Sequence, residues 1–292
     1  DALTYLRRRA DVARVLDAAR CKAAQEAVGC FRPGRRVSGE HGWGTRAGAP
    51  GVQHALEWTG SELKAAGLKD AGVESYAVPG VMWVPQTWKL EIVGDAAFGV
   101  GTQTVTLASA FPQPGGASIP GGTLTAPVVY VGHGTDADLA GRDLKGKIAV
   151  VRVRPEPSLF GAGEQGVAAR LVEKGAAGVI NAIEGQGNPQ SIDPRLACGR
   201  APCFRIGGQD AWFLTTVIGK AANAGLLDRV KIAASLTSRE QDRLTSANGV
   251  ATIPGQSAQR IRTNAHHAGH FPGRHYQASP RARPTVAARY VA

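Results

Sequence analysis

The stretch Glu173-Lys-Gly-Ala-Ala-Gly-Val-Ile180 decides the fold that we predict for this chain of 292 residues. It joins the end of an expected helix over residues 166–174 to an expected buried strand over residues 178–182. Upstream, the apolar runs Val128–Val131 and Ile148–Val153 predict two further strands. Strands and a helix therefore lie close together in this part of the sequence.

The same pattern continues downstream as far as residue 236. A loop rich in Gly and Pro over residues 185–203 leads to a short strand, Phe204–Ile206, and then to a helix that we expect Asp210 to cap and Gly225 to end. The strand Val230–Leu236 closes the block. Because strands and helices do not alternate strictly, we predict a small α+β or β-rich unit rather than a doubly wound domain.

The sequence before this block is less regular. Residues 50–67 predict a helix that buries Leu56 and Leu63 on one face. A strand-like run follows at residues 88–93, and the stretch 111–122, rich in Pro and Gly, predicts a linker or domain boundary.

The net charge of +11 is concentrated at the two ends of the chain. Residues 1–36 hold nine Lys or Arg and four Asp or Glu, and residues 243–292 hold seven Arg and no acidic residue. A nucleic-acid site would show basic residues interleaved with aromatic ones on folded elements, whereas these Arg residues lie among Ala, Pro and Gly. Since no apolar stretch is long enough to span a bilayer either, we predict partners that are neither nucleic acid nor membrane.

The four cysteines are too few for a disulfide framework. Cys198 and Cys203 are separated by four residues in a turn with Gly and Pro, a spacing compatible with a local disulfide, with free thiols or, less well, with a metal site. Cys21 and Cys30 carry no recognisable pattern. The pairing is left open.

Other motifs favour ordinary structural interpretations. Residues 161–166 match the pattern GxGxxG, but they stand too far from the preceding strand for a dinucleotide site, so we predict no bound cofactor there. His41, His54 and His133 are isolated and more typical of solvated or capping histidines than of ligands. The sequence contains neither a G-x-S-x-G elbow nor a His-Glu-x-x-His motif.

A dense histidine cluster, Asn264-Ala-His-His-Ala-Gly-His270 with His275 after it, follows an expected strand over residues 261–265. Neutral imidazole is a good zinc ligand, and strand ends are common positions for sites in open sheets. A polar tail that happens to be rich in His is the alternative interpretation, and composition alone favours neither.

The run Leu244-Thr-Ser-Ala-Asn-Gly-Val-Ala-Thr-Ile-Pro-Gly255, followed by Asn264-Ala-His-His267, resembles the entry to the catalytic domain of co-catalytic zinc exopeptidases, the aminopeptidases and the plasma glutamate carboxypeptidase type. Gly141-Arg-Asp-Leu-Lys-Gly-Lys-Ile-Ala-Val150 and the stretch 173–180 are similar to the protease-associated domain that these enzymes often carry as an insert. The segment Glu62-Leu-Lys-Ala-Ala-Gly-Leu68 is similar to the N-terminal part of the catalytic domain in that family.

This resemblance implies that His266 is the first zinc ligand and that His267 is the variable residue after it. The family requires an Asp at the next position, where this chain has Ala268, and then further Asp, Glu and His ligands, but no carboxylate follows Asp242. Two zinc ions need anionic ligands, and the attacking water needs a base. We therefore expect zinc, the family's metal, not to be bound stably, and we assign no catalytic or cofactor-binding residue.

These expectations define a domain organisation. The resemblance implies a mixed α/β and α+β fold, in which a β-rich protease-associated domain over residues 120–240 is inserted in an incomplete α/β zinc-exopeptidase domain. The N-terminal part of that exopeptidase domain covers residues 37–119, and its first catalytic strands cover residues 241–270. We also predict a poorly specified basic helical segment over residues 1–36 and a disordered tail over residues 271–292. The composition changes abruptly near residues 268–272, and we hypothesise that the reading frame shifts or the gene is damaged there.

The predicted function follows from the resemblance. The family hydrolyses peptide bonds with metal-activated water, and we expect this chain to be a catalytically incomplete member. The alternative is a non-catalytic module in which the protease-associated domain binds a peptide or a protein partner. The family also implies a secreted or periplasmic location.

Overall fold

The computed structural model describes residues 56–57, 60–61, 63–65, 68–98, 103–154, 166–190 and 198–252. It divides into two compact units, one of residues 81–241 and one that contains the described residues before 81 and after 241. The predicted basic segment 1–36 and the predicted tail 271–292 lie outside the described residues, so both stay predictions, as do the other domain assignments.

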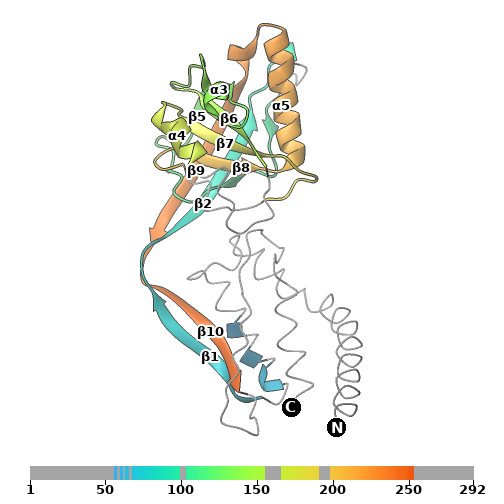
Figure 1. Cartoon of the computed structure of the whole chain (residues 1–292). Helices are drawn as coiled ribbons and strands as arrows, with labels where there is room; N and C mark the ends of the chain where they lie inside the picture. The colour runs from blue at the N-terminus through green and yellow to red at the C-terminus, as the bar shows by residue number, and fades with distance from the viewer. Residues whose placement is uncertain are drawn as a thin grey trace, which may run out of the picture. The chain divides into compact units, whose positions relative to one another are not determined.

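Within the described residues, the larger unit contains a curled eight-stranded sheet with the strand order β3-β2-β9-β5-β6-β7-β8-β4 (Figure 1). The strands are β2 (Met82–Ile92), β3 (Val105–Thr106), β4 (Phe111–Pro112), β5 (Leu124–Tyr130), β6 (Ile148–Val153), β7 (Gly178–Ile183), β8 (Cys203–Ile206) and β9 (Lys231–Gln241). Neighbours from β5 to β8 run parallel, and the outer pairs are antiparallel. The predicted mixed α/β and α+β class is confirmed.

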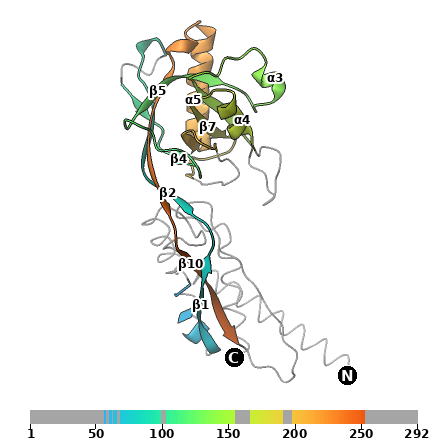
Figure 2. The ribbon, with the colours of Figure 1, turned by 90° about the vertical axis from the view of Figure 1, so that its left-hand side faces the viewer.

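Helices cover both faces of the parallel strands (Figure 2). The helices are α3 (Asp136–Leu139), α4 (Val167–Glu173) and α5 (Gly208–Asn223), with the short 3-10 turns η1 (Ala96–Phe98) and η3 (Leu227–Arg229). Because side chains alternate along a strand, Ile148 and Val150 of β6 join a core cluster with α5, whereas Ala149 and Val151 join a second cluster with α3 and α4. The sequence pattern predicts a small α+β or β-rich unit, whereas in the structure four neighbouring strands, β5 to β8, run parallel and are covered by helices.

Strand β7 lies at the centre of this arrangement. All six of its residues are buried, as expected of a parallel strand covered on both faces, and it pairs with β6 and β8. Its polar residue Asn181 donates hydrogen bonds from Nδ2 to the Phe204 carbonyl oxygen at 3.2 Å and to Cys203 Sγ at 3.5 Å. The strand predicted from the stretch 173–180 is confirmed.

The predicted linker over residues 111–122 is wrong, because its first residues belong to the sheet. Phe111 is 1% exposed, packs edge-to-face on Trp88 with ring centroids 5.1 Å apart, and pairs with Arg205 of β8. The backbone amide of Gln113 donates to the Cys203 carbonyl oxygen at 2.9 Å. Contacts of Phe111 and Gln113 with β8 therefore attach the first part of the stretch 111–122 to the sheet.

The predicted capping role of Asp210 is also wrong. Helix α5 has Gly207 as its N-cap, and Asp210 lies in the first turn, where Oδ2 accepts hydrogen bonds from the backbone amide and hydroxyl of Ser109 at 2.7 and 2.6 Å. Asn188 Oδ1 accepts instead from the Asp210 amide at 3.1 Å. The acidic side chain is thus used to hold a distant segment rather than the end of its own helix.

The smaller unit contains strands β1 (Lys69–Val78) and β10 (Leu244–Thr252), which pair antiparallel from Val78↔Leu244 to Lys69↔Thr252. Strand β10 lies within the run 244–255 on which the family resemblance depends. Before β1, Leu56 and Leu63 are buried at 5% and 7% exposure, and the described residues around them are helical, as predicted. The strand expected over 261–265 lies outside the described residues.

Candidate functional site

The predicted metal ligand His266 lies outside the described residues, as do His267, Ala268, His270 and His275. The structure describes the strand that leads toward them, β10, as far as Thr252. Among residues 56–252, excluding the gaps given above, no group of three or more His, Cys, Asp or Glu side chains could hold a metal ion. The structure thus leaves the zinc assignment of His266 as a prediction.

Among the other motifs that the sequence singles out, His41, His54 and residues 161–165 lie outside the described part of the chain. Gly166, the last glycine of the GxGxxG match, has a φ of +82° and precedes α4. The pattern's final glycine therefore serves as the entry to a short helix, where a left-handed backbone favours glycine.

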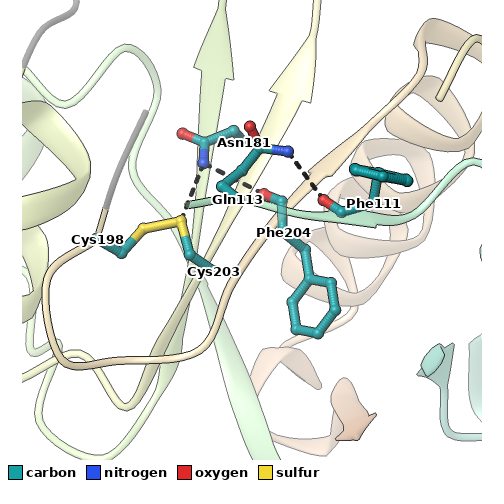
Figure 3. The surroundings of a disulfide bond; sticks show 6 residues. All are labelled: Phe111, Gln113, Asn181, Cys198, Cys203 and Phe204. Carbon is teal, nitrogen blue, oxygen red and sulfur yellow. Dashed lines mark hydrogen bonds between the residues drawn. A yellow bond between two sulfur atoms is a disulfide. The ribbon is translucent and has the colours of Figure 1, made fainter. Parts of the chain in front are cut away.

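Cys198 and Cys203 form a disulfide, which decides between the three alternatives that their spacing allows (Figure 3). Both cysteines are fully buried, and Cys203 is the first residue of β8. The bond therefore ties the end of the loop between β7 and β8 to the sheet. Such bonds form and persist in oxidising environments.

Charged side chains gather at the carboxyl ends of the parallel strands, where open sheets place ligand sites. Arg152 belongs to β6 and Arg154 follows directly after it, Glu184 follows β7, and His133 lies in the turn after β5. We call these four residues the basic edge. Glu184 directly follows the fully buried run of β7, and Arg152 is the one exposed residue of β6.

Glu184 is the centre of the basic edge. Its Oε1 contacts Arg152 Nη2 and lies 3.6 Å from His133 Nε2, and its Oε2 lies 3.2 Å from Arg154 Nε. The Glu184 amide donates to the Val153 carbonyl oxygen at 2.8 Å, which continues the β6–β7 ladder and fixes the position of the residue. One carboxylate thus holds three basic side chains from two neighbouring strand ends.

The turn that carries His133 is held by Asp138. Its Oδ2 accepts hydrogen bonds from the His133 amide at 3.1 Å, from the Thr135 amide at 3.1 Å and from the Thr135 hydroxyl at 2.8 Å. These bonds, chiefly that from the Thr135 hydroxyl, lower the pKa of Asp138 below its ordinary value. Gly132 has a φ of +50°, and a Cβ there would collide with the Asp138 carboxylate, so the turn requires glycine.

A second contact links this turn to α4. Arg170 of α4 donates from Nη2 to the Gly134 carbonyl oxygen, and its Nη1 lies 3.4 Å from Asp136 Oδ1. A Cβ on Gly134 would overlap the side chain of Val167. The turn and the first residues of α4 therefore pack closely. Asp138 and Arg170 together hold the turn that carries His133 beside Glu184.

Sequence reasoning missed the basic edge, although one signal was present. The apolar run of β6 is followed by Arg152 and Arg154, two charged residues on the same side of the chain, and the fully buried run of β7 is followed by Glu184. Opposite charges at the ends of two adjacent parallel strands predict an ion-pair cluster. That prediction depends on knowing that β6 and β7 are neighbours.

Comparison with solved structures finds chains of similar fold. The structure of a Peptidase M28 precursor from Shewanella amazonensis SB2B aligns over 80% of this chain and 54% of its own, at 21% identity and a TM-score of 0.55. That of a zinc aminopeptidase from Bacillus subtilis aligns over 90% of this chain and 57% of its own, at 17% identity and a TM-score of 0.54. The chain thus spans little more than half the length of these solved structures, with which it shares a fold.

No family model matches the chain, and no curated protein matches it in sequence. Within the described residues, no helix is long and apolar enough to cross a membrane.

Proposed function

We propose that this chain is part of a protein of the zinc exopeptidase type and that it does not itself hydrolyse peptide bonds. The fold shared with an M28 peptidase and a zinc aminopeptidase supports the first half of this proposal, together with the resemblance of residues 244–267 to the entry of the catalytic domain. One observation carries the second half: residues 243–292 contain no Asp or Glu, so this segment supplies no acidic ligand after His266.

The donor set does not fit a pair of zinc ions. His266 is followed by Ala268 where the resemblance requires an Asp, and the histidines around it supply neutral nitrogen atoms alone. Two divalent cations held close together need carboxylates to offset their charge, and hydrolysis needs a base to take a proton from water. We therefore derive no catalytic step through zinc for this chain.

The experiment that tests the proposal measures hydrolysis by the purified full chain. Aminoacyl p-nitroanilides are incubated with the chain in the presence of added zinc, and an intact zinc aminopeptidase is the positive control. We expect no release of p-nitroaniline above the rate without protein. Cleavage that zinc stimulates and a chelator abolishes would contradict the proposal.

The nucleotide sequence gives an independent test of why the carboxylates are missing. If the frame shifts near residues 268–272, one of the other two frames downstream of codon 266 should encode a run resembling Asp-Gly-Ala-x-Asp-Asn. If neither frame contains such a run, the frameshift is excluded, although the absence of acidic residues after Asp242 still stands.

A second candidate function is supported by the basic edge. Residues 81–241 form a compact unit with its own core, and an interaction module that binds a peptide or a protein partner needs only such a unit and an exposed site on it. Binding of a peptide or protein partner by the full chain should then be unaffected by His266→Ala. It should be lost when residues of the basic edge are substituted. Loss on His266→Ala alone would contradict this second candidate.

We also propose a secreted or periplasmic location. The buried disulfide between Cys198 and Cys203 supports it, because such bonds are rare in reducing compartments. Trapping free thiols in the freshly isolated protein tests this directly: we expect Cys198 and Cys203 to resist alkylation until a reductant is added under denaturing conditions.

A further inference from the structure

Residues 79–81 and 242–243 connect the two compact units, and the boundary between the units falls within or directly beside these segments. The ladder of β1 with β10 ends at the pair Val78↔Leu244, and the ladder of β2 with β9 begins at the pair Met82↔Gln241. The two connecting segments therefore lie opposite each other between two ladders. We call residues 79–81 and 242–243 together the ribbon break.

The ribbon break contains three residues on one strand and two on the other. An extra residue on one strand is the arrangement of a β-bulge, which disrupts the ladder locally and bends the strand. Pro79 adds to the disruption, because proline has no backbone N–H to donate. Both strands therefore lose regular pairing at the same place, where the chain passes from one unit to the other.

Both strands also leave the extended conformation at the ribbon break. Gly80 has a φ of +99° and Arg243 has a φ of +50°, whereas an extended strand has a negative φ. A left-handed backbone is uncommon for a residue with a side chain, so Arg243 is the more unusual of the two. Residues that absorb the changes of φ and ψ in hinges lie in loops or at the ends of elements, as these two do.

The ribbon break is loosely packed. All five of its residues are exposed, and a Cβ on Gly80 would meet no atom within 4 Å. Within the described part of the chain, no hydrogen bond or ion pair is formed by any of the five. A segment of this kind opens at little cost in free energy, in contrast to the paired strands on both sides of it.

We propose that the ribbon break is a hinge, at which the compact unit 81–241 changes its orientation relative to the remainder of the chain. Gly80 and Arg243 absorb the change of backbone angles, and the ladders before and after the break keep their pairing. Because two strands cross the break rather than one, the motion is bending and twisting of the pair. The inference goes beyond both proposed functions and depends on neither.

Double electron–electron resonance on the full chain tests the proposal. Nitroxide labels are attached at Ser75→Cys in β1 and Asn223→Cys in α5, exposed positions that belong to different units. Cys21→Ser and Cys30→Ser remove the two cysteines outside the disulfide. Labels at Lys145→Cys and Asn223→Cys, both within residues 81–241, are the control. The distance distribution across the ribbon break should be at least about twofold wider than the distribution within the unit.

Matched variants separate a hinge at the ribbon break from general flexibility of the ribbon. Arg243→Gly should widen the distribution across the break, because glycine adopts left-handed and right-handed backbone about equally well. Asp70→Gly is the control, since Asp70 also has a positive φ, of +52°, but lies in β1 beyond the label at residue 75. It should leave the distribution unchanged. Gly80→Ala should narrow the distribution, because a Cβ disfavours positive φ.

Amide hydrogen exchange measures the same property in the unlabelled wild type. The amides of Gly80, Val81 and Arg243 should exchange at least about tenfold faster than those of residues 88–92 in β2, where the ladder with β9 is intact. Circular dichroism of each variant used for the distance measurements checks that it is folded.

Four results would overturn the inference. The first two are a distribution across the ribbon break as narrow as that within residues 81–241, and equal effects of Arg243→Gly and Asp70→Gly. The other two are a distribution that Gly80→Ala leaves unchanged or widens, and amide exchange at the ribbon break as slow as that in β2. The p-nitroanilide and partner-binding experiments test the proposed functions separately, so none of these results decides between those functions.

Discussion

At the scale of single residues, Asp138 holds the turn after β5 through three hydrogen bonds to one carboxylate oxygen. Because these bonds lower its pKa, the ionised form contributes to stability at every pH above the ordinary aspartate pKa of about 4, and the contribution is lost as the pH falls through the lowered value. Asp138→Asn should therefore lower the urea midpoint at neutral pH, and the difference from wild type should shrink in acid.

Asp136 provides the matched control for that measurement. Its side chain is 93% exposed and its ion pair to Arg170 spans 3.4 Å, so Asp136→Asn should leave the urea midpoint almost unchanged. Equal midpoints for Asp138→Asn and wild type at neutral pH would show that the turn does not depend on this carboxylate.

Two glycines of α5 give opposite predictions for the same substitution. A Cβ on Gly208 would overlap the backbone of Gly185, whereas a Cβ on Gly219 meets nothing within 4 Å. Gly208→Ala should lower the free energy of unfolding by about 3 kcal/mol or more, since backbone must move. Gly219→Ala should raise it by about 0.5–1 kcal/mol, because alanine is the better helix former. Urea unfolding followed by circular dichroism measures both, and a stable Gly208→Ala would mean that the loop after β7 does not cross α5 so closely.

At the scale of elements, the disulfide fixes the start of β8. The loop that it closes is short, with a sequence separation of 5, so the chain-entropy model gives a stabilisation of about 2 kcal/mol. The double variant Cys198→Ala with Cys203→Ala should lose that amount relative to the oxidised wild type. When the wild type is refolded in dithiothreitol, its free energy of unfolding should approach that of the variant. The free energy of unfolding of the variant should not change with dithiothreitol. A reductant effect of the same size on both would assign it to Cys21 and Cys30 instead.

Some elements could be predicted from the sequence because their own residues determine them. Strands β6 and β7 are apolar runs rich in β-branched residues, and α5 repeats buried positions at helical spacing, so local pattern and tertiary burial agree. Strand β4 and the role of Asp210 could not be predicted, because both depend on contacts with residues about a hundred positions away, such as Ser109 with Asp210.

The same reasoning explains what was missed at the candidate site. The resemblance draws attention to His266, which lies outside the described residues, whereas the basic edge consists of ordinary Arg, His and Glu residues that no motif marks. Arg154 and Glu184 are 30 positions apart, and they meet only because β6 and β7 pair in parallel. Strand order is therefore the information that the sequence pattern lacks at this site.

At the scale of the whole molecule, residues 81–241 contain every element needed for a separate folding unit. Both core clusters, the disulfide and the eight-stranded sheet lie within these limits. A domain of this size buries enough apolar surface to fold without the remainder of the chain. We therefore predict that residues 81–241 expressed alone are folded and unfold in one cooperative transition.

Thermal unfolding of the segment 81–241 and of the full chain measures this autonomy. The midpoint temperature of the isolated segment should lie within a few degrees of that of one transition of the full chain, because the contacts that stabilise its two core clusters are internal to it. Leu214→Ala, which removes a fully buried side chain from α5, should then lower that transition equally in the segment and in the full chain, by about 2–5 kcal/mol in free energy. A segment that is unfolded alone, or that does not respond to Leu214→Ala, would show that residues outside 81–241 are required for the core.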